Sequence, residues 1–348
     1  MLTLYFNRCF SAYAFLIESL KDSWEGQLKV IISHSNPDPY LMRVADHFEL
    51  EPSVDGEEYL DFILQICKKY RVDIFFPRKH VTYLSQYRNE FSTLGIQCAL
   101  VCSPEHYQLF DHKFNATQHL LEQNLVNAPH VALVDDYSQF ETQYDRIRSN
   151  RLDHSKGHET VCLKPNIGIG GKGFMRISHR RTEQDDLFRE SLHSIAYSRL
   201  TRTLKDMQPF PKLLLSTYLQ DEELSVDCIG HEGQLLAAYP RSYVNKYEQR
   251  YEYQSELIET CRQISSHYQL NYLYNVQFKK HRGEWYFIEL NTRSAAGAHR
   301  ICPMQVCPLS ITLKLILKQP ITDDLSIQWG QLIQRREQYT VIDDKQRR

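Results

Sequence analysis

The first 104 residues alternate short apolar runs with helical patterns. This alternation restricts the folds open to the chain more than any other feature. The apolar runs cover residues 2–6, 28–32, 73–76 and 96–101. One intervening pattern places four apolar residues on a single helical face: Leu60, Ile63, Leu64 and Cys67. Strands that alternate with helices form parallel sheets covered by those helices. Residues 1–104 are therefore predicted to form a small doubly wound α/β domain.

Beyond Ser103-Pro104 the pattern changes to strands and hairpins. The strand-like runs cover residues 160–164, 174–177, 213–219, 224–229, 234–239, 275–279 and 285–291. Antiparallel sheets are expected here, which makes this part α+β. A chain of 348 residues is too long for one ordinary core, so two or three packed domains are expected. The last stretch, 331–348, is polar and is predicted to be a peripheral tail.

Composition excludes several classes of function. The 41 Lys and Arg residues nearly balance the 43 Asp and Glu residues, so nucleic acid is not expected as the main partner. The nine cysteines are scattered and indicate reduced thiols in a cytoplasmic protein, without the paired spacing of a zinc site. The uncharged stretch 9–17 is too short to span a bilayer, so no membrane partner is expected.

Four of the thirteen glycines lie between residues 168 and 173, in the segment from Lys164 to Arg176. Glycines let backbone N–H groups approach an anion closely and form a nest for phosphate oxygens. The segment satisfies GxGxxG, but a strand rather than a helix follows, so dinucleotide binding is not supported. A P-loop is excluded because Gly173 stands where Ser or Thr should follow the lysine, and a kinase is disfavoured because HRD and DFG are missing. A tight hairpin with exposed lysines remains the alternative.

A predicted hairpin, 275–279 with 285–291, carries a second group of polar side chains. Side chains alternate along a strand, so Glu289, Asn291 and also Phe287 are expected on one face, and Gln277 can join them from the neighbouring strand. Three oxygen donors would suit Mg²⁺ when ATP phosphates supply the remaining ligands. The alternative is a half-buried hairpin with an exposed glutamate. Arg293 follows directly and would compensate a buried carboxylate.

A third segment, 218–227, places Glu223 after an apolar run that ends at Leu219. A carboxylate at the end of an apolar slot suits the hydroxyl pair of a ribose, with the slot taking adenine. An ordinary acidic turn is the alternative.

Taken together, Lys113, Lys164 with its glycine loop, Glu223, and Gln277 with Glu289-Leu-Asn291-Thr-Arg293 resemble the ATP-grasp superfamily in order and spacing. The nearest resemblance is to carbamoyl phosphate synthetase and biotin carboxylase. It implies a Rossmann-like pre-ATP-grasp domain (1–104), a small lobe with the glycine-rich loop (105–210) and a large lobe with the metal site (211–330). Thr217 stands where the family often has glutamate, and residues 294–297 replace its commoner glycine-rich ending.

The resemblance also implies roles for individual residues. The metal ligands would be Gln277, Glu289 and Asn291, binding Mg²⁺ with Mn²⁺ as an alternative. Arg293 would stabilise negative charge on the transferring phosphoryl group or acyl phosphate. The ATP-binding residues would be Lys113, Lys164, Gly168, Gly170, Gly171, Lys172, Gly173, Tyr218, Leu219 and Glu223. By their position in the sequence, Arg241 and Arg300 are the candidates for holding the substrate carboxylate.

The function expected from this set is an ATP- and Mg-dependent ligase that activates a carboxylate as an acyl phosphate and joins it to an amine. The substrates would be small molecules, such as an amino acid or a peptide, and a homo-oligomer is left open. Two alternatives remain at this stage. One is a bicarbonate-activating carboxylase, and the other is an ATP-binding sensor or accessory subunit without turnover.

Overall fold

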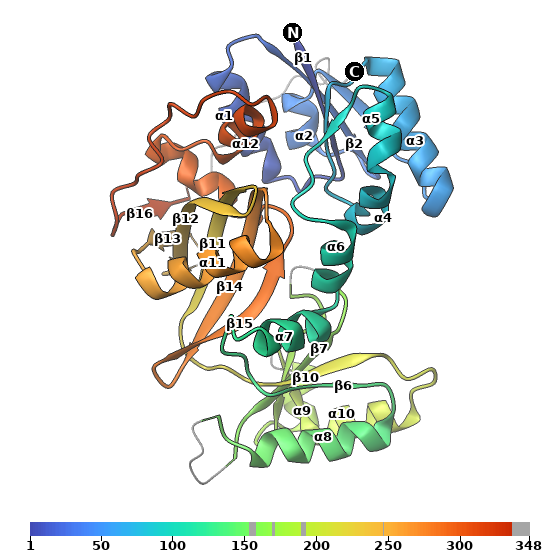
Figure 1. Ribbon diagram of the computed structural model, residues 1–348. Coiled ribbons are helices and arrows are strands. Elements are labelled where there is room, and N and C mark those ends of the chain that lie inside the picture. The colour runs from blue at the N-terminus through green and yellow to red at the C-terminus, as the bar shows by residue number, and fades with distance from the viewer. Residues whose placement is uncertain (153–157, 169–170, 189–192, 246, 336–348) are drawn as a thin grey trace.

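The computed structural model describes residues 1–152, 158–168, 171–188, 193–245 and 247–335 (Figure 1). These residues form three sheets: a five-stranded sheet near the N-terminus, a second five-stranded sheet and a six-stranded sheet. Figure 1 shows the N-terminal sheet at one end of the molecule and the sheet around β7 and β10 at the other, with the six-stranded sheet between them.

The N-terminal domain is a doubly wound parallel sheet. Its strands are β1 (Leu2–Asn7), β2 (Leu28–His34), β3 (His47–Leu50), β4 (Ile74–Phe76) and β5 (Gln97–Cys98). Its helices are α1 (Tyr13–Ser23), α2 (Pro39–Val44), α3 (Gly56–Tyr70), α4 (Val81–Leu84), η1 (Ser85–Tyr87) and α5 (Arg88–Thr93). All strand pairs are parallel, in the order β3-β2-β1-β4-β5. The predicted α/β architecture is confirmed.

Apolar residues cover both faces of this sheet, as parallel sheets require. One face packs against α1, α2 and the distant helix α12 (Pro308–Ile316), and the other packs against α3, α4 and α5. Because α12 follows five strands of the six-stranded sheet in sequence, its packing here joins the N-terminal domain to the rest of the chain. The strand order reverses between β1 and β4, so the carboxyl ends of these two strands flank the switch point of the sheet.

The lobe at the opposite end is built on the order β6-β10-β7-β8-β9. Its strands are β6 (Val131–Val134), β7 (Val161–Pro165), β8 (Met175–Ser178), β9 (Ser194–Ala196) and β10 (Leu213–Thr217). Helices α6 (Pro104–Asp111) and α7 (Lys113–Glu122) lead into it, and α8 (Tyr137–Ser149), α9 (Glu183–Phe188) and α10 (Tyr197–Asp206) belong to it. All its strand pairs are antiparallel except β8 with β9. An apolar core lies between the sheet and helices α8 and α10.

The six-stranded sheet is antiparallel throughout, in the order β15-β14-β11-β12-β13-β16. Its strands are β11 (Glu223–His231), β12 (Gln234–Tyr243), β13 (Glu248–Tyr251), β14 (Tyr272–His281), β15 (Glu284–Asn291) and β16 (Leu332–Gln334). Helix α11 (Ser255–Tyr268) and parts of α6 and α7 pack on one apolar face. The short helix η2 (Ala298–Met304) and α12 pack on the other face. Strand β16 comes from the predicted tail, whose residues 336–348 lie outside the described structure.

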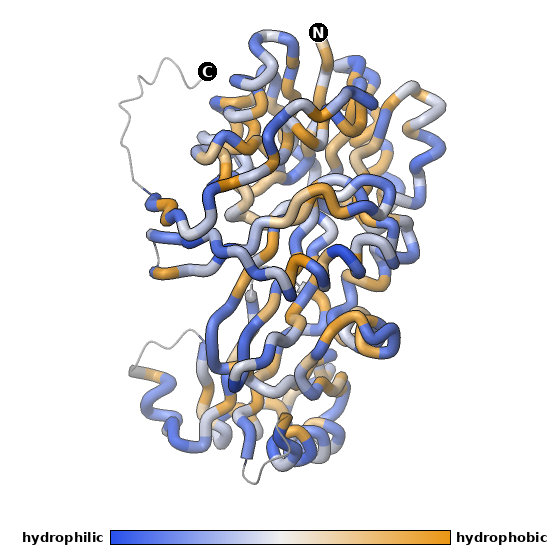
Figure 2. Tube along the Cα trace, turned by 60° about the vertical axis from the view of Figure 1, so that its left-hand side comes forward, coloured by the Kyte–Doolittle hydropathy of each residue, from blue (hydrophilic) through white to orange (hydrophobic). Residues whose placement is uncertain are grey.

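Hydropathy follows this layering. Figure 2 shows hydrophobic residues along many inner strands and hydrophilic residues along much of the outer helices. Among the described residues, no helix is long and apolar enough to cross a membrane.

Candidate functional site

The hairpin of β14 and β15 brings the three predicted metal ligands together. Gln277 lies directly opposite Glu289 in the strand register, and Asn275 lies opposite Asn291. The Asn291 amide donates a hydrogen bond to Glu289 Oε1 at 3.0 Å, as expected for side chains on one strand face. One carboxylate and two amides thus cluster at the end of the hairpin.

The prediction that Phe287 shares this face is wrong. The register shifts between Gln277 and Phe278, so Phe278 pairs with Phe287 and Ile288 is the extra residue of a β-bulge. The bulge reverses the alternation of faces, and Phe287 packs with Phe278 in the apolar core under α11. The bulge therefore leaves Glu289 on the polar face while burying the aromatic ring on the other.

Two lysines from the other lobe approach Glu289. Lys113 is the first residue of α7, and its Nζ lies 3.7 Å from Glu289 Oε2 and donates to the Gly168 carbonyl at 2.5 Å. Lys164 lies on β7, where burial lowers the pKa of its ammonium, Glu289 opposes that shift and the charge of Lys113 adds to it. Asn166 holds this arrangement, because its side-chain oxygen accepts from the Phe114 N–H at 3.0 Å at the start of α7. The arrangement therefore joins two cations and one carboxylate across the lobes.

The glycine loop connects β7 to β8, the strand–loop–strand form that the sequence predicts. Gly171 and Gly173 have φ of +67° and +77°, a conformation that side chains with Cβ rarely adopt. A Cβ at Gly173 would lie 2.9 Å from the ring carbons of Pro165, whereas Gly171 has open space. Lys172 is exposed, and Gly170 lies outside the described residues.

The residues predicted for adenosine lie beside these lysines, around the link from β10 to β11. Glu223 begins β11 and is exposed, and its carboxylate lies 3.7 Å from Lys279 Nζ. Tyr218 is half-buried, with the Lys279 ammonium 5.6 Å and the Arg176 guanidinium 5.5 Å from its ring centre. Leu219 is buried. An apolar residue, an aromatic ring and a carboxylate are therefore close together here.

The side chains at the hairpin could bind a hard cation only if other groups supply the remaining ligands. Within the described part of the chain, no group of three or more His, Cys, Asp or Glu side chains could hold a metal ion. Gln277, Glu289 and Asn291 offer one carboxylate and two amide oxygens, which suits Mg²⁺ whose other ligands are phosphate oxygens and water. The lysines nearby would receive those phosphates.

Two family models match the chain. Residues 209–339 match the family described as "ATP-grasp in the biosynthetic pathway with Ter operon", and residues 13–99 match the family described as "PylC-like, N-terminal domain". Residues 209–339 belong to an ATP-grasp family. A comparison with curated proteins finds no match.

Solved structures share the ATP-grasp fold along nearly the whole chain. N5-carboxyaminoimidazole synthetase from Staphylococcus aureus, complexed with ADP, has a TM-score of 0.66 at 11% identity, covering 94% of this chain and 80% of that one. L-amino acid ligase from Bacillus licheniformis has a TM-score of 0.62 at 13% identity, covering 91% and 74%. The biotin carboxylase domain of Hydrogenobacter thermophilus 2-oxoglutarate carboxylase, in complex with MgADP and bicarbonate, has a TM-score of 0.66 at 13% identity, covering 95% and 73%. At these identities the likeness concerns the fold.

Three arginines were predicted to act in catalysis: Arg241, Arg293 and Arg300. The structure puts them in three different surroundings. Arg293 comes two residues after β15 ends, and burial lowers the pKa of its guanidinium to about 10, with the charge of Arg78 acting in the same direction. Arg300 lies in η2, with its guanidinium 5.7 Å from the ring centre of Tyr243 and a buried Nη1 that has no hydrogen-bond partner. Arg300 therefore has one buried donor that no described residue satisfies.

Arg241 lies in the same cross-strand row as Gln277, a predicted metal ligand, since it pairs with Ser225, which pairs with Gln277. It is 2% exposed, and its Nε donates to Asp227 Oδ2 at 2.6 Å. The structure thus adds a buried partner for Arg241 that sequence proximity did not indicate, and its contact with substrate stays a prediction.

Sequence reasoning missed Arg78, which lies beside Arg293 although it belongs to the N-terminal domain. A signal was available, because Pro77-Arg78 directly follows the apolar run 73–76 and so had to lie at the carboxyl end of a parallel strand.

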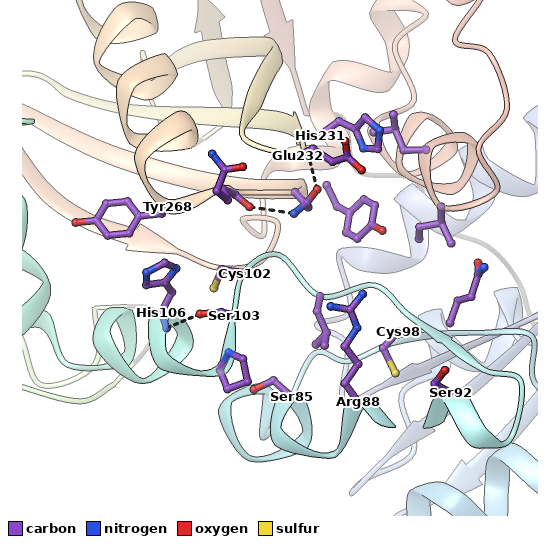
Figure 3. A pocket seen from close by; sticks show the side chains of 18 of the residues that line it. Ser85, Arg88, Ser92, Cys98, Cys102, Ser103, His106, His231, Glu232 and Tyr268 are labelled. Carbon is purple, nitrogen blue, oxygen red and sulfur yellow. Dashed lines mark hydrogen bonds between the residues drawn. The ribbon is translucent and has the colours of Figure 1, made fainter. Parts of the chain in front are cut away.

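A cavity of about 1390 Å³ lies elsewhere in the molecule. Figure 3 shows Ser85, Arg88 and His106 on one side of it and His231 and Glu232 on the other. In the part of the chain that the structure describes, none of the predicted site residues lines this cavity.

Proposed function

We propose that this protein is an ATP- and Mg-dependent ligase that activates a carboxylate as an acyl phosphate and joins it to an amine. The observation that carries the proposal is the meeting of Lys113, Lys164 and Glu289 across the two lobes, with Lys113 Nζ 3.7 Å from Glu289 Oε2. Two cations suit the phosphates of ATP, and a carboxylate flanked by amides suits the metal that accompanies them.

Each part of ATP has a candidate partner in this arrangement. Lys113 and Lys164 would contact the phosphates, and the backbone N–H groups of the loop from Gly168 to Gly173 would close over them. Glu223 would hold the ribose hydroxyls, and Tyr218 with Leu219 would line the adenine slot. The Lys113 hydrogen bond to the Gly168 carbonyl supports this picture, because it ties the phosphate lysine to the loop.

The metal would be held by Gln277, Glu289 and Asn291. Bound Mg²⁺ would supply neutralisation of phosphate charge. Because the Asn291 amide now directs a donor toward Glu289, its oxygen would have to turn inward to ligate a cation.

The remaining residues would act on the carboxylate. One of its oxygens bonds to the γ-phosphorus as the bond to ADP breaks, and the amine nitrogen then bonds to the acyl carbon as phosphate leaves and a proton is lost. Arg293 would stabilise charge on the acyl phosphate, and Arg300 would bind a carboxylate through its unpaired Nη1. Arg241 would contribute to carboxylate binding, with its guanidinium positioned by the pair with Asp227. No covalent nucleophile is needed, because positioning supplies most of the rate.

We take an amino acid or a small peptide as the substrate class, which the likeness to an L-amino acid ligase supports. A cytoplasmic location is consistent with the nine cysteines, all of which are free thiols.

The test is phosphate release from MgATP by the purified protein against pooled amino acids and dipeptides. Glu289→Gln is the matched variant, because it keeps the size of the side chain and removes the charge. Release that needs a pool member and falls by at least about 100-fold in the variant supports the ligase, since a charged metal ligand contributes several kcal/mol. Release that needs only bicarbonate would instead establish the carboxylase, and ATP binding without release from any pool would establish the sensor.

A further inference from the structure

Arg78 lies at the switch point of the N-terminal sheet. The strand order reverses between β1 and β4, and Arg78 comes two residues after β4 ends. In open α/β sheets, ligands bind outside the carboxyl ends of the strands at such a point. The fully buried Asn7, at the end of β1, accepts from the Arg78 backbone N–H at 2.6 Å. The backbone position of Arg78 is therefore fixed by both β1 and β4.

The guanidinium of Arg78 meets that of Arg293. Both donate to the same oxygen, the carbonyl of Ser294, from Arg78 Nη2 at 3.2 Å and from Arg293 Nη1 at 3.3 Å. Arg78 Nη2 also donates to the Ser294 hydroxyl at 2.8 Å. Aromatic rings near the start of α1 support both cations, with Tyr13 4.4 Å from the Arg78 guanidinium and Phe10 5.1 Å from that of Arg293. The two like charges are thus held side by side.

Neither cation forms an ion pair with a described residue, although the charges of Glu289 and Asp111 act on the Arg293 guanidinium from a greater distance. Among the described residues, no Asp or Glu oxygen lies within 4.0 Å of either guanidinium. The Arg78 Nε is buried and has no hydrogen-bond partner. Arg78, Arg293, Tyr13 and Thr292 also line a cavity of about 30 Å³, room for a group of only a few atoms. Adjacent half-buried cations that lack an ion-pair partner are unfavourable, and arginine forks match an oxyanion in two-point contacts.

We propose that Arg78 and Arg293 form a two-arginine site for a small oxyanion, the carboxylate that the enzyme activates. The identity of this anion rests on the proposed function, whereas the existence of the site does not. Arg293 comes two residues after Asn291, so the anion lies next to the metal hairpin. The N-terminal domain therefore completes the active site instead of only supporting it.

The first test measures anion binding without turnover. The melting temperature of the full chain is followed as sodium phosphate replaces sodium chloride at constant ionic strength, with MgADP present to fill the nucleotide site. Phosphate should stabilise the wild type, and Arg78→Met should lose most of that effect. Arg262→Met is the control, because Arg262 is an exposed arginine paired with Glu259 on α11, and it should keep the full effect. An equal phosphate effect in Arg78→Met and wild type would overturn the proposal.

The second test uses a carboxylate substrate found in the pool screen. Arg78→Lys keeps the charge and loses the fork, so the KM for the carboxylate should rise by about 10-fold or more while the KM for ATP stays within about 2-fold, as expected for a lost charged hydrogen bond. This variant also covers the case in which Arg78→Met does not fold. An unchanged carboxylate KM would sink the two-arginine site and leave the ligase standing. A phosphate effect that depends on Arg78, in a protein that releases no phosphate from ATP with any pool, would sink the ligase and leave the site standing.

Discussion

Replacing Arg241 with methionine should destabilise the large lobe, because Asp227 would stay buried without its ion-pair partner. The side chains of Arg241 and Asp227 are 2% and 3% exposed, and Nε lies 2.6 Å from Oδ2. With an effective dielectric constant of roughly 20, unit charges at 2.6 Å attract by about 6 kcal/mol, most of which offsets the cost of desolvating both groups. Removing one partner of a buried pair costs about 3–5 kcal/mol, so Arg241→Met should lower the unfolding free energy by that amount.

Packing around the guanidinium leaves little room for relaxation. A Cβ at Gly297 would lie 2.9 Å from Arg241 Nη1, so the chain after the β14–β15 hairpin passes directly against this guanidinium. Asp227 would keep one bond, from the Asn275 amide to Oδ1 at 2.9 Å. One neutral donor compensates a buried carboxylate only in part.

The assay is urea unfolding of four proteins: the wild type, Arg241→Met, Asp227→Asn and the double variant. The double variant should be more stable than Arg241→Met, because neutralising Asp227 removes the uncompensated charge. The reasoning is refuted if Arg241→Met unfolds at the wild-type urea concentration. If its carboxylate KM rises at the same time, Arg241 is a substrate ligand and its pair with Asp227 contributes little to folding.

Two further predictions concern the glycine loop and a half-buried histidine. Gly173→Ala should raise the KM for ATP by about 10-fold, because a residue with a Cβ in the left-handed backbone conformation costs about 1–2 kcal/mol and this Cβ would also meet the Pro165 ring. Gly171→Ala is the control and should have the smaller effect, because its Cβ would lie in open space. Equal effects of the two variants would rule out the Pro165 contact. Burial lowers the pKa of His299, which stacks on Phe15, to about 4. Between about pH 6.5, near the ordinary pKa of histidine, and pH 4, the unfolded chain binds more protons at this residue than the folded chain does. The unfolding free energy should therefore fall as the pH falls through that window, by on the order of 3 kcal/mol. A His299→Phe variant with the same pH dependence would contradict this.

Local patterns in the sequence carried the prediction of the fold class. The alternation of apolar runs and helical faces in residues 1–104 predicts a parallel sheet because period and run length are local properties of the chain. The same holds for the glycine cluster after Lys164, whose strand–loop–strand form follows from the strand residues on both sides. Strands β13 and β16 escaped prediction, because they have only four and three residues and are strands only by pairing with each other and with β12.

In the candidate site, too, some features follow from local sequence and others from tertiary structure. The sequence by itself determined that Gln277, Glu289 and Asn291 lie on one hairpin, since a charged turn between two strands leaves few other arrangements. Only the tertiary structure decided that Phe287 turns to the opposite face, because a bulge depends on the register of both strands. It also decided that Arg78 stands beside Arg293, 215 positions away in sequence, because the sheet order and the packing of α12 bring the two domains together. Burial and charge compensation depend on every neighbour in space, and sequence spacing alone does not contain them.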